Sequence, residues 1–172
     1  MNWIVAALAI VAAFDVAQRG HQLRGARAQQ RLVVATGAFV VAVGLAALST
    51  PLLDALDISG PNMQIGAGIV LGVYSIIALV SWDDATAPAA LYGGLVPLLF
   101  PIVLTPAVGV VVLAVAARNG LLVPTVASGV VAALLASPAI SARIGHRPIR
   151  MASAAAGVVA SVAMIVDGAF AV

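Results

Sequence analysis

Asp15 is the ionisable residue with the clearest chemical potential in this chain, because it directly follows the apolar stretch Trp3–Phe14. At the centre of a membrane helix, an aspartate costs roughly 2.5–3.5 kcal/mol, and such residues usually pair with a cation or line a solute path. Arg19 lies one helical turn later, in the acid-first order that favours an ion pair. Two interpretations of Asp15 are therefore open: a structural ion pair with Arg19, or a contact to a substrate or a coupling cation.

The sequence P-L-L-F-P-I-V-L-T-P-A-V-G at 97–109 is the second candidate, because it places three prolines inside one long apolar run. Proline removes a backbone donor and clashes with the carbonyl four residues earlier, so a helix bends or breaks there. The Thr105 hydroxyl is available to a freed carbonyl in lipid. A helix that begins again after Pro106 would direct backbone donors and a positive dipole at an anionic group such as a carboxylate. A kinked helix with no binding role is the alternative.

Asn62 and Gln64 are further candidates for substrate contacts, because they stand at the start of another apolar run. A position at the membrane interface would equally explain their polarity. The chain has no cysteine and lacks the zinc spacing, the phosphate-binding loop and the dinucleotide fingerprint of common enzymes. We therefore predict no catalytic residue, no metal and no cofactor, and we do not expect an enzyme.

The amino-acid composition indicates the environment in which this chain lies. Hydrophobic residues make up 63% of it and charged residues 8%, with a mean hydropathy of +1.18. A soluble domain carries about 25% charged residues. We therefore predict an integral membrane protein whose main partner is the lipid bilayer. The arginines form short loop clusters without interleaved aromatic residues, which argues against nucleic-acid binding.

The elements that must position the candidate residues are membrane-spanning helices, each of which needs about 20 mostly apolar residues. Six stretches meet this requirement, at approximately 2–18, 32–49, 63–82, 91–116, 121–141 and 151–171. Most arginines fall in the loops after the first and the fifth stretch. The positive-inside rule then places these loops in the cytoplasm and both termini outside, on the periplasmic side of the inner (plasma) membrane.

This orientation divides one all-α, polytopic membrane domain (1–172) into two three-helix halves, 1–82 and 91–172, with opposite directions. Secondary transporters with inverted repeats are built in this way. Small residues at four-residue spacing let membrane helices approach closely, so they predict a packing face on the last helix of each half. These residues are Gly66, Gly68 and Gly72 in the third helix and Ser153, Gly157 and Ser161 in the sixth.

Two segments resemble motifs of the MarC integral membrane family. I-S-G-P-N-M-Q-I-G-A-G-I-V-L-G at 58–72 is similar to G-I-S-x-P-x-x-x-I-A-G-G-I-L-x, and V-P-L-L-F-P-I-V-L-T-P-A-V-G at 96–109 is similar to V-P-L-A-x-P-L-I-A-G-P-G-A-I. The resemblance extends over essentially the whole chain and implies a six-helix fold of the LysE superfamily. Some members are regarded as transporters of small neutral amino acids. Asp15 and Pro106 occupy motif positions, whereas Val16 replaces the proline that follows the aspartate in that family.

From these observations we expect a secondary transporter or exporter of small solutes, with small neutral amino acids implied by the resemblance. Alternating access would occur at a site between the first and fourth helices, with substrate contacts from Asp15, Thr105, Pro106, Asn62 and Gln64. The alternative is a non-transporting scaffold subunit of a larger membrane complex. The small-residue faces would also suit a homo-oligomer or a membrane-protein partner.

Overall fold

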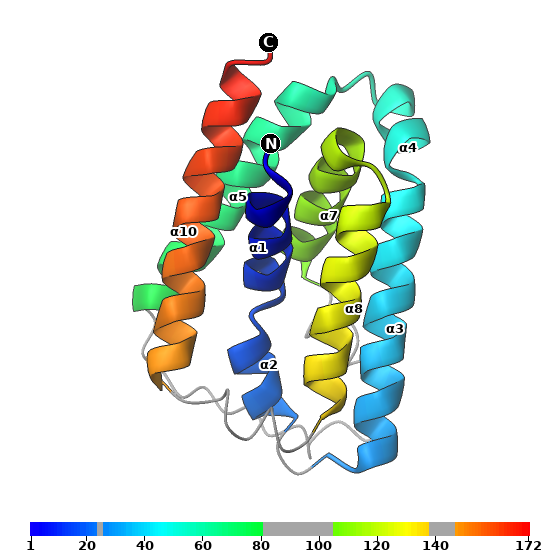
Figure 1. Cartoon of the computed structure of the whole chain (residues 1–172), viewed down its shortest axis with the longest axis vertical. Coiled ribbons are helices and arrows are strands. Elements are labelled where there is room, and N and C mark those ends of the chain that lie inside the picture. Colours follow the sequence, from blue (N-terminus) through cyan, green and yellow to red (C-terminus); the bar gives the residue numbers. More distant parts are fainter. Residues whose placement is uncertain (24–25, 81–104, 138–146) are drawn as a thin grey trace.

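The structure is a computed structural model that describes residues 1–23, 26–80, 105–137 and 147–172. Within these ranges the ordered elements are all helices and none is a strand (Figure 1). In chain order they are α1 (Trp3–Phe14), α2 (Val16–Gln22), α3 (Ala28–Ala47), α4 (Ser49–Ala55), α5 (Gly60–Val80), α7 (Pro106–Asn119), α8 (Leu122–Ala136) and α10 (Arg147–Ala169). The all-α prediction is thus confirmed for the described part of the chain. Residues 97–104, most of the proline-rich run, lie outside it.

Three helices of the described ranges are long and apolar enough to cross a bilayer: α3, α5 and the Pro148–Ala169 part of α10. The helices α7 and α8 are also apolar but shorter, with 14 and 15 residues. Along α5, the exposed residues Ile69, Val73 and Ile77 recur at four-residue intervals and form an apolar stripe on the outside of the bundle. Such a stripe suits lipid rather than water, so the chain is a membrane-embedded helical protein.

The helix boundaries follow from identifiable caps. The Asn2 side chain accepts a hydrogen bond from the Ile4 N–H at 3.0 Å and begins α1. Pro106 occupies the first turn of α7, where its missing N–H removes no helical hydrogen bond. Gly120 ends α7 with a φ of 75°, a conformation that glycine adopts without steric strain. The first predicted span was wrong in one respect: it is two helices, α1 and α2, rather than one.

The direction of the helices alternates along the chain. In Figure 1, α1, α5 and α8 run downwards, whereas α3, α7 and α10 run upwards, and both termini lie at the top. The first half therefore runs down, up and down, and the second half runs up, down and up. The ends of α2 and α8 and the starts of α3 and α10 all lie in the lower part of the picture.

Most packing in the bundle joins helices of different halves. The largest contact is between α5 and α10, followed by that between α3 and α8. The helix α1 packs against α7, α8 and α10, and the helix α7 packs against α1, α3 and α5. The core between them consists mainly of alanine and valine with a few larger side chains, among them Ile10, Phe14 and Leu71. The two halves therefore interlock and share one hydrophobic core.

The α5–α10 contact is close because small residues line it. A Cβ on Gly68 would lie 2.9 Å from the Ser161 carbonyl oxygen, and one on Gly72 would lie 3.0 Å from Ser161 Oγ. A Cβ on Gly157 would overlap the Ser75 hydroxyl. Gly66 has no neighbour within 4 Å of the equivalent position. The predicted packing role is confirmed for Gly68, Gly72 and Gly157, and it was wrong for Gly66, which lies on another side of α5.

Candidate functional site

Asp15 separates α1 from α2. Its backbone has a φ of 43° and a ψ of 60°, in the left-handed region that aspartate enters more readily than most residues. Its N–H donates to the Ala12 carbonyl at 3.0 Å, and its Oδ1 accepts from the Gln18 N–H at 3.3 Å. Asp15 thus ends one helix and caps the next. The first predicted span is thus broken at this aspartate, and no proline stands beside it.

The carboxylate of Asp15 is buried and only partly satisfied. The residue is 4% exposed, and its Oδ2 atom has no hydrogen-bond partner among the described residues. An unsatisfied buried acceptor typically costs about 1–3 kcal/mol, and more when it carries charge. An atom of this kind needs a specific explanation. A ligand that donates to Oδ2 would supply one.

Arg19 does not form a contact ion pair with Asp15 among the described ion pairs, so that interpretation was wrong at contact distance. Its Nη2 instead donates to the Tyr74 hydroxyl of α5 at 3.2 Å. The guanidinium still acts on Asp15 through its charge, as does that of Arg150 in the first turn of α10. Asp15, Arg19, Tyr74 and Arg150, which we call the Asp15 cluster, therefore bring together two cations, one carboxylate and one phenol.

The Asp15 cluster is assembled from three separate parts of the chain. Asp15 and Arg19 come from α1–α2, Tyr74 comes from the last turns of α5, and Arg150 comes from the start of α10. The charges of Asp15, Arg19 and Arg150 all act on the Tyr74 hydroxyl. Arg150 is half-buried, and its Nε has no hydrogen-bond partner among the described residues. Sequence reasoning missed Tyr74 and Arg150 as partners because they are distant from Asp15 along the chain.

Thr105 and Pro106 begin α7, as the proline pattern predicts. The Thr105 Oγ1 accepts a hydrogen bond from the Val108 N–H at 3.4 Å, so the hydroxyl caps the helix. Pro106 is exposed. The start of α7 and the end of α1 both lie near the middle of the bundle's height (Figure 1), and the two helices pack together. No hydrogen bond of the described residues joins Thr105 to Asp15.

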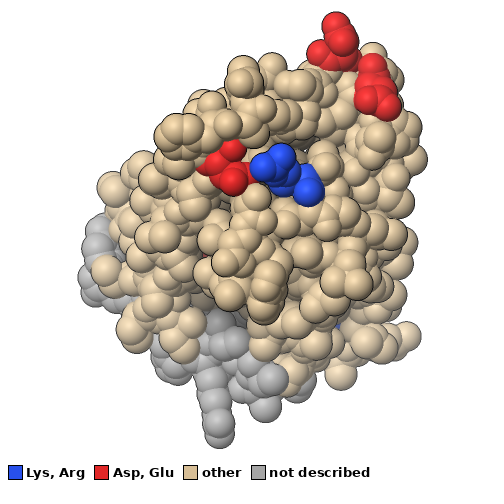
Figure 2. Space-filling model, turned by 45° about the horizontal axis from the view of Figure 1, so that its top comes forward, with Lys and Arg blue, Asp and Glu red and all other residues tan. Residues whose placement is uncertain are grey.

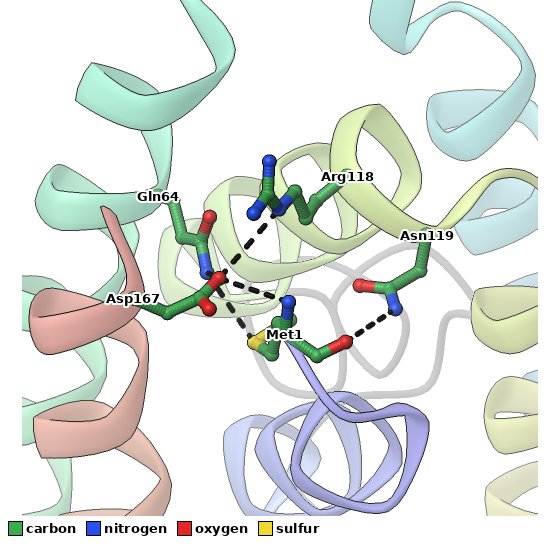
Figure 3. A network of polar contacts seen from close by, with 5 residues as sticks. All are labelled: Met1, Gln64, Arg118, Asn119 and Asp167. Carbon is green, nitrogen blue, oxygen red and sulfur yellow. Dashed lines mark hydrogen bonds and ion pairs between the residues drawn. The ribbon is translucent and has the colours of Figure 1, made fainter. Parts of the chain in front are cut away.

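Asn62 and Gln64 have different environments. Asn62 is exposed, whereas Gln64 is fully buried on the inner face of α5. The Gln64 Nε2 donates to Asp167 Oδ2 on α10 at 2.9 Å (Figure 3). The structure therefore does not bring these two predicted substrate contacts together, and neither lies in the Asp15 cluster.

Asp167 is the centre of a second polar network. Its Oδ2 lies 3.0 Å from the Met1 amino nitrogen and 3.6 Å from the Nε of Arg118 on α7. Asn119 donates from Nδ2 to the Met1 carbonyl at 3.1 Å (Figure 3). We call Met1, Gln64, Arg118, Asn119 and Asp167 the Asp167 cluster. It links both halves of the chain, and sequence reasoning missed it because its members are distant from one another along the chain.

The two clusters lie at different depths. The Asp167 cluster is at the start of α1 and the Asp15 cluster at its end, 12 residues later, which corresponds to about 18 Å along the helix. Figure 2 turns the end with both termini towards the viewer and shows acidic and basic side chains in contact, surrounded by uncharged residues. The Asp167 cluster thus lies at the end of the bundle that carries the termini, and the Asp15 cluster lies deeper.

The described residues contain no group of three or more His, Cys, Asp or Glu side chains that could hold a metal ion. The Asp15 cluster places charged groups of both signs inside an apolar bundle, an arrangement that can bind a small charged or polar ligand. Comparison of the chain with protein-family models, with curated proteins and with solved structures gives no match.

Proposed function

We propose that this chain is a secondary transporter of small solutes in the inner (plasma) membrane, with six spans in two inverted halves. The observation that carries the proposal is the packing of the helices. Each helix of the first half can be matched with one of the second half: α1 with α7, α3 with α8 and α5 with α10. Under this matching, the α1–α8 contact corresponds to the α7–α3 contact. In the same way, the α1–α10 contact corresponds to the α7–α5 contact. Three further contacts, α1–α7, α3–α8 and α5–α10, each join a helix to its own counterpart.

This packing supports an inverted repeat because the matched helices also have opposite directions (Figure 1). A pseudo-two-fold axis in the membrane plane relates repeats of this kind in transporters. The leading helix of each half is irregular: α1 ends at Asp15, and α7 begins at Pro106. Discontinuous helices at mid-membrane depth are the usual place for substrate and coupling-ion sites in such proteins.

The mechanism follows from the position of the two clusters. Substrate would bind between the first and fourth helices, near the Asp15 cluster and the N-terminus of α7. The Asp167 cluster would close one side through contacts between the halves, such as Arg118–Asp167 and Gln64–Asp167. Rocking of one half against the other would break these contacts and open that side, which is the usual form of alternating access.

The substrate class rests on the resemblance to the MarC family, which implies small neutral amino acids. The orientation rests on the arginines: the lower side of the bundle in Figure 1, where α2 and α8 end and α3 and α10 begin, would be cytoplasmic, and both termini would be periplasmic.

A non-transporting scaffold subunit is the alternative. The close α5–α10 contact favours it, because Gly68, Gly72 and Gly157 serve the packing of the bundle itself. The two functions differ in one measurable property, since a scaffold subunit moves no solute.

The test is uptake by the purified chain in liposomes, with labelled glycine, alanine, serine and threonine and a panel of unrelated small solutes. We expect saturable uptake of at least one amino acid above that of empty liposomes. We expect Pro106→Ala to slow it, because alanine allows α7 to extend towards its N-terminus. If no solute of the panel enters, transport is refuted and the scaffold function stands.

A further inference from the structure

We infer that the Asp15 cluster recognises its substrate as a zwitterion, with Asp15 holding the ammonium group and Arg150 the carboxylate. This inference rests on the proposed transport function and specifies the residues and the ligand class. Two atoms carry it: Asp15 Oδ2, a buried acceptor without a partner, and Arg150 Nε, a buried donor without a partner.

The two atoms belong to groups of opposite charge. Asp15 Oδ2 accepts hydrogen bonds, whereas Arg150 Nε donates one. Asp15 is only 4% exposed, and the helices α1 and α2 on either side of it both pack against α10, which carries Arg150. In an apolar bundle each unfilled group is unfavourable, and a direct bond between them would satisfy both. The structure shows no such bond between the two side chains. An α-amino acid supplies an ammonium donor for the first group and a carboxylate acceptor for the second.

The charge of Arg19, the other cation of the cluster, narrows the choice of ligand further. Asp15, Arg19 and Arg150 together carry one net positive charge, which by itself would favour a simple anion. An anion, however, leaves Asp15 Oδ2 without a donor and places a second negative charge near it. A zwitterion satisfies both groups and leaves the charge balance unchanged. We therefore assign the site to a zwitterion rather than to a monoanion.

The surroundings of the cluster favour a small side chain. Gly157 lies seven residues, or about two turns, beyond Arg150 and hence on the same side of α10. A Cβ at Gly157 would already overlap the Ser75 hydroxyl and would lie 3.1 Å from Ala12 Cβ. The helices α1, α5 and α10 are thus in tight contact beside the site, which leaves little space for a large substrate side chain on that side.

The experiment compares amino acids with analogues that lack one charge. Equilibrium binding and liposome uptake are measured with L-alanine, with L-alaninamide, which lacks the carboxylate, and with propanoate, which lacks the amine; glycine, serine and threonine are tested with their matched analogues. We expect each analogue to bind roughly 10- to 100-fold more weakly than its parent, because each loses one charge-assisted hydrogen bond.

Two variants assign the charges to residues. Asp15→Asn should abolish the discrimination between alanine and propanoate and leave that between alanine and alaninamide. Arg150→Gln should do the opposite. Asparagine retains both the cap and the left-handed backbone that Asp15 requires. A role that is only structural would weaken all ligands equally, so the crossed pattern identifies recognition.

The controls are matched in backbone and charge. Asp57→Asn replaces an exposed aspartate that also has a positive φ, of 53°, and Arg27→Gln replaces an exposed arginine. Both should preserve the two discriminations. Unchanged discrimination in Asp15→Asn and Arg150→Gln would overturn the inference and leave transport intact, as would uptake confined to solutes with one charge or none. Absence of uptake across the whole panel would overturn the proposed function and this inference with it.

Discussion

The α5–α10 contact provides a sharp test of the fold, because two glycines of one helix should respond to the same substitution in opposite ways. In Gly68→Ala, the new Cβ would lie 2.7 Å from Ile165 Cγ1, 2.9 Å from the Ser161 carbonyl oxygen and 3.2 Å from the Ile165 nitrogen. Two of these atoms belong to the backbone of α10 and move only if the helix moves. In Gly66→Ala, the new Cβ would have no neighbour within 4 Å.

The magnitude follows from these distances. Overpacking a tight contact costs typically about 1–3 kcal/mol, because the elements must separate to restore normal van der Waals distances. Replacing an unhindered helical glycine by alanine instead stabilises by roughly 0.5–1 kcal/mol. The gain in helix propensity is the same in both variants and cancels, so we expect their free energies of unfolding to differ by the overpacking cost alone, about 1–3 kcal/mol, with Gly66→Ala the more stable. At about 1.4 kcal/mol per factor of ten, this is roughly a 5- to 140-fold difference in the unfolding constant.

The assay is reversible unfolding in mixed micelles of mild detergent and dodecyl sulfate, followed by the circular dichroism of the helices. Both variants change one glycine of α5 to alanine, so their helix propensities and their effects on the unfolded chain are equal. Only the contact with α10 differs. Equal unfolding curves for the two variants, or a less stable Gly66→Ala, would refute the packing of α5 against α10.

Three further predictions concern the topology and the two clusters. The chain has no cysteine, so an impermeant thiol reagent added to intact cells should label Ala55→Cys but should reach Gln29→Cys only after lysis; the reverse pattern would invert the orientation. Asp15→Ala should lower the free energy of unfolding by about 2–3 kcal/mol, from a lost cap of about 1 kcal/mol and a left-handed alanine of about 1–2 kcal/mol. Asp15→Asn should stay within about 0.5 kcal/mol of the parent, and equal losses in both variants would contradict the capping role. A double-mutant cycle of Gln64→Leu and Asp167→Leu should give a coupling energy of about 0.5–3 kcal/mol in the same unfolding assay, because each change removes one partner of the 2.9 Å bond; additive effects would show that the bond does not contribute.

Features that depend on local sequence were predictable. The apolar composition indicates a membrane-embedded helical protein, because backbone groups in lipid must be satisfied within a helix. The start of α7 at Pro106 was predictable from the proline, which tolerates the first helical turn and disfavours the interior. The close packing at Gly68 and Gly157 was predictable from spacing, although spacing alone did not separate Gly66 from Gly68, which lie about 200° apart around α5.

The break at Asp15 was only partly predictable. No proline or glycine marks it, and the left-handed backbone depends on a carboxylate that can accept from Gln18 while the N–H of Asp15 reaches Ala12. Aspartate permits this conformation but does not require it. Phe14 and Val16, on either side of the break, are both buried, so the broken conformation lies within the packed core. The sequence therefore identified the residue and not the conformation.

The partners of the charged residues depend on the topology, and here sequence reasoning had least to work with. Gln64 bonds to Asp167, 103 residues later, and Arg19 bonds to Tyr74, 55 residues later. The nearest opposite charge in sequence predicted the Asp15–Arg19 contact, but the fold places Arg19 against α5 instead. Because both long-range bonds connect α5 to another span, the third helix controls how polar groups are paired at both depths. A change in the position of α5 relative to α10 would alter the Asp15 cluster and the Asp167 cluster together, and the proposed alternating access would need such a coupling between the two depths.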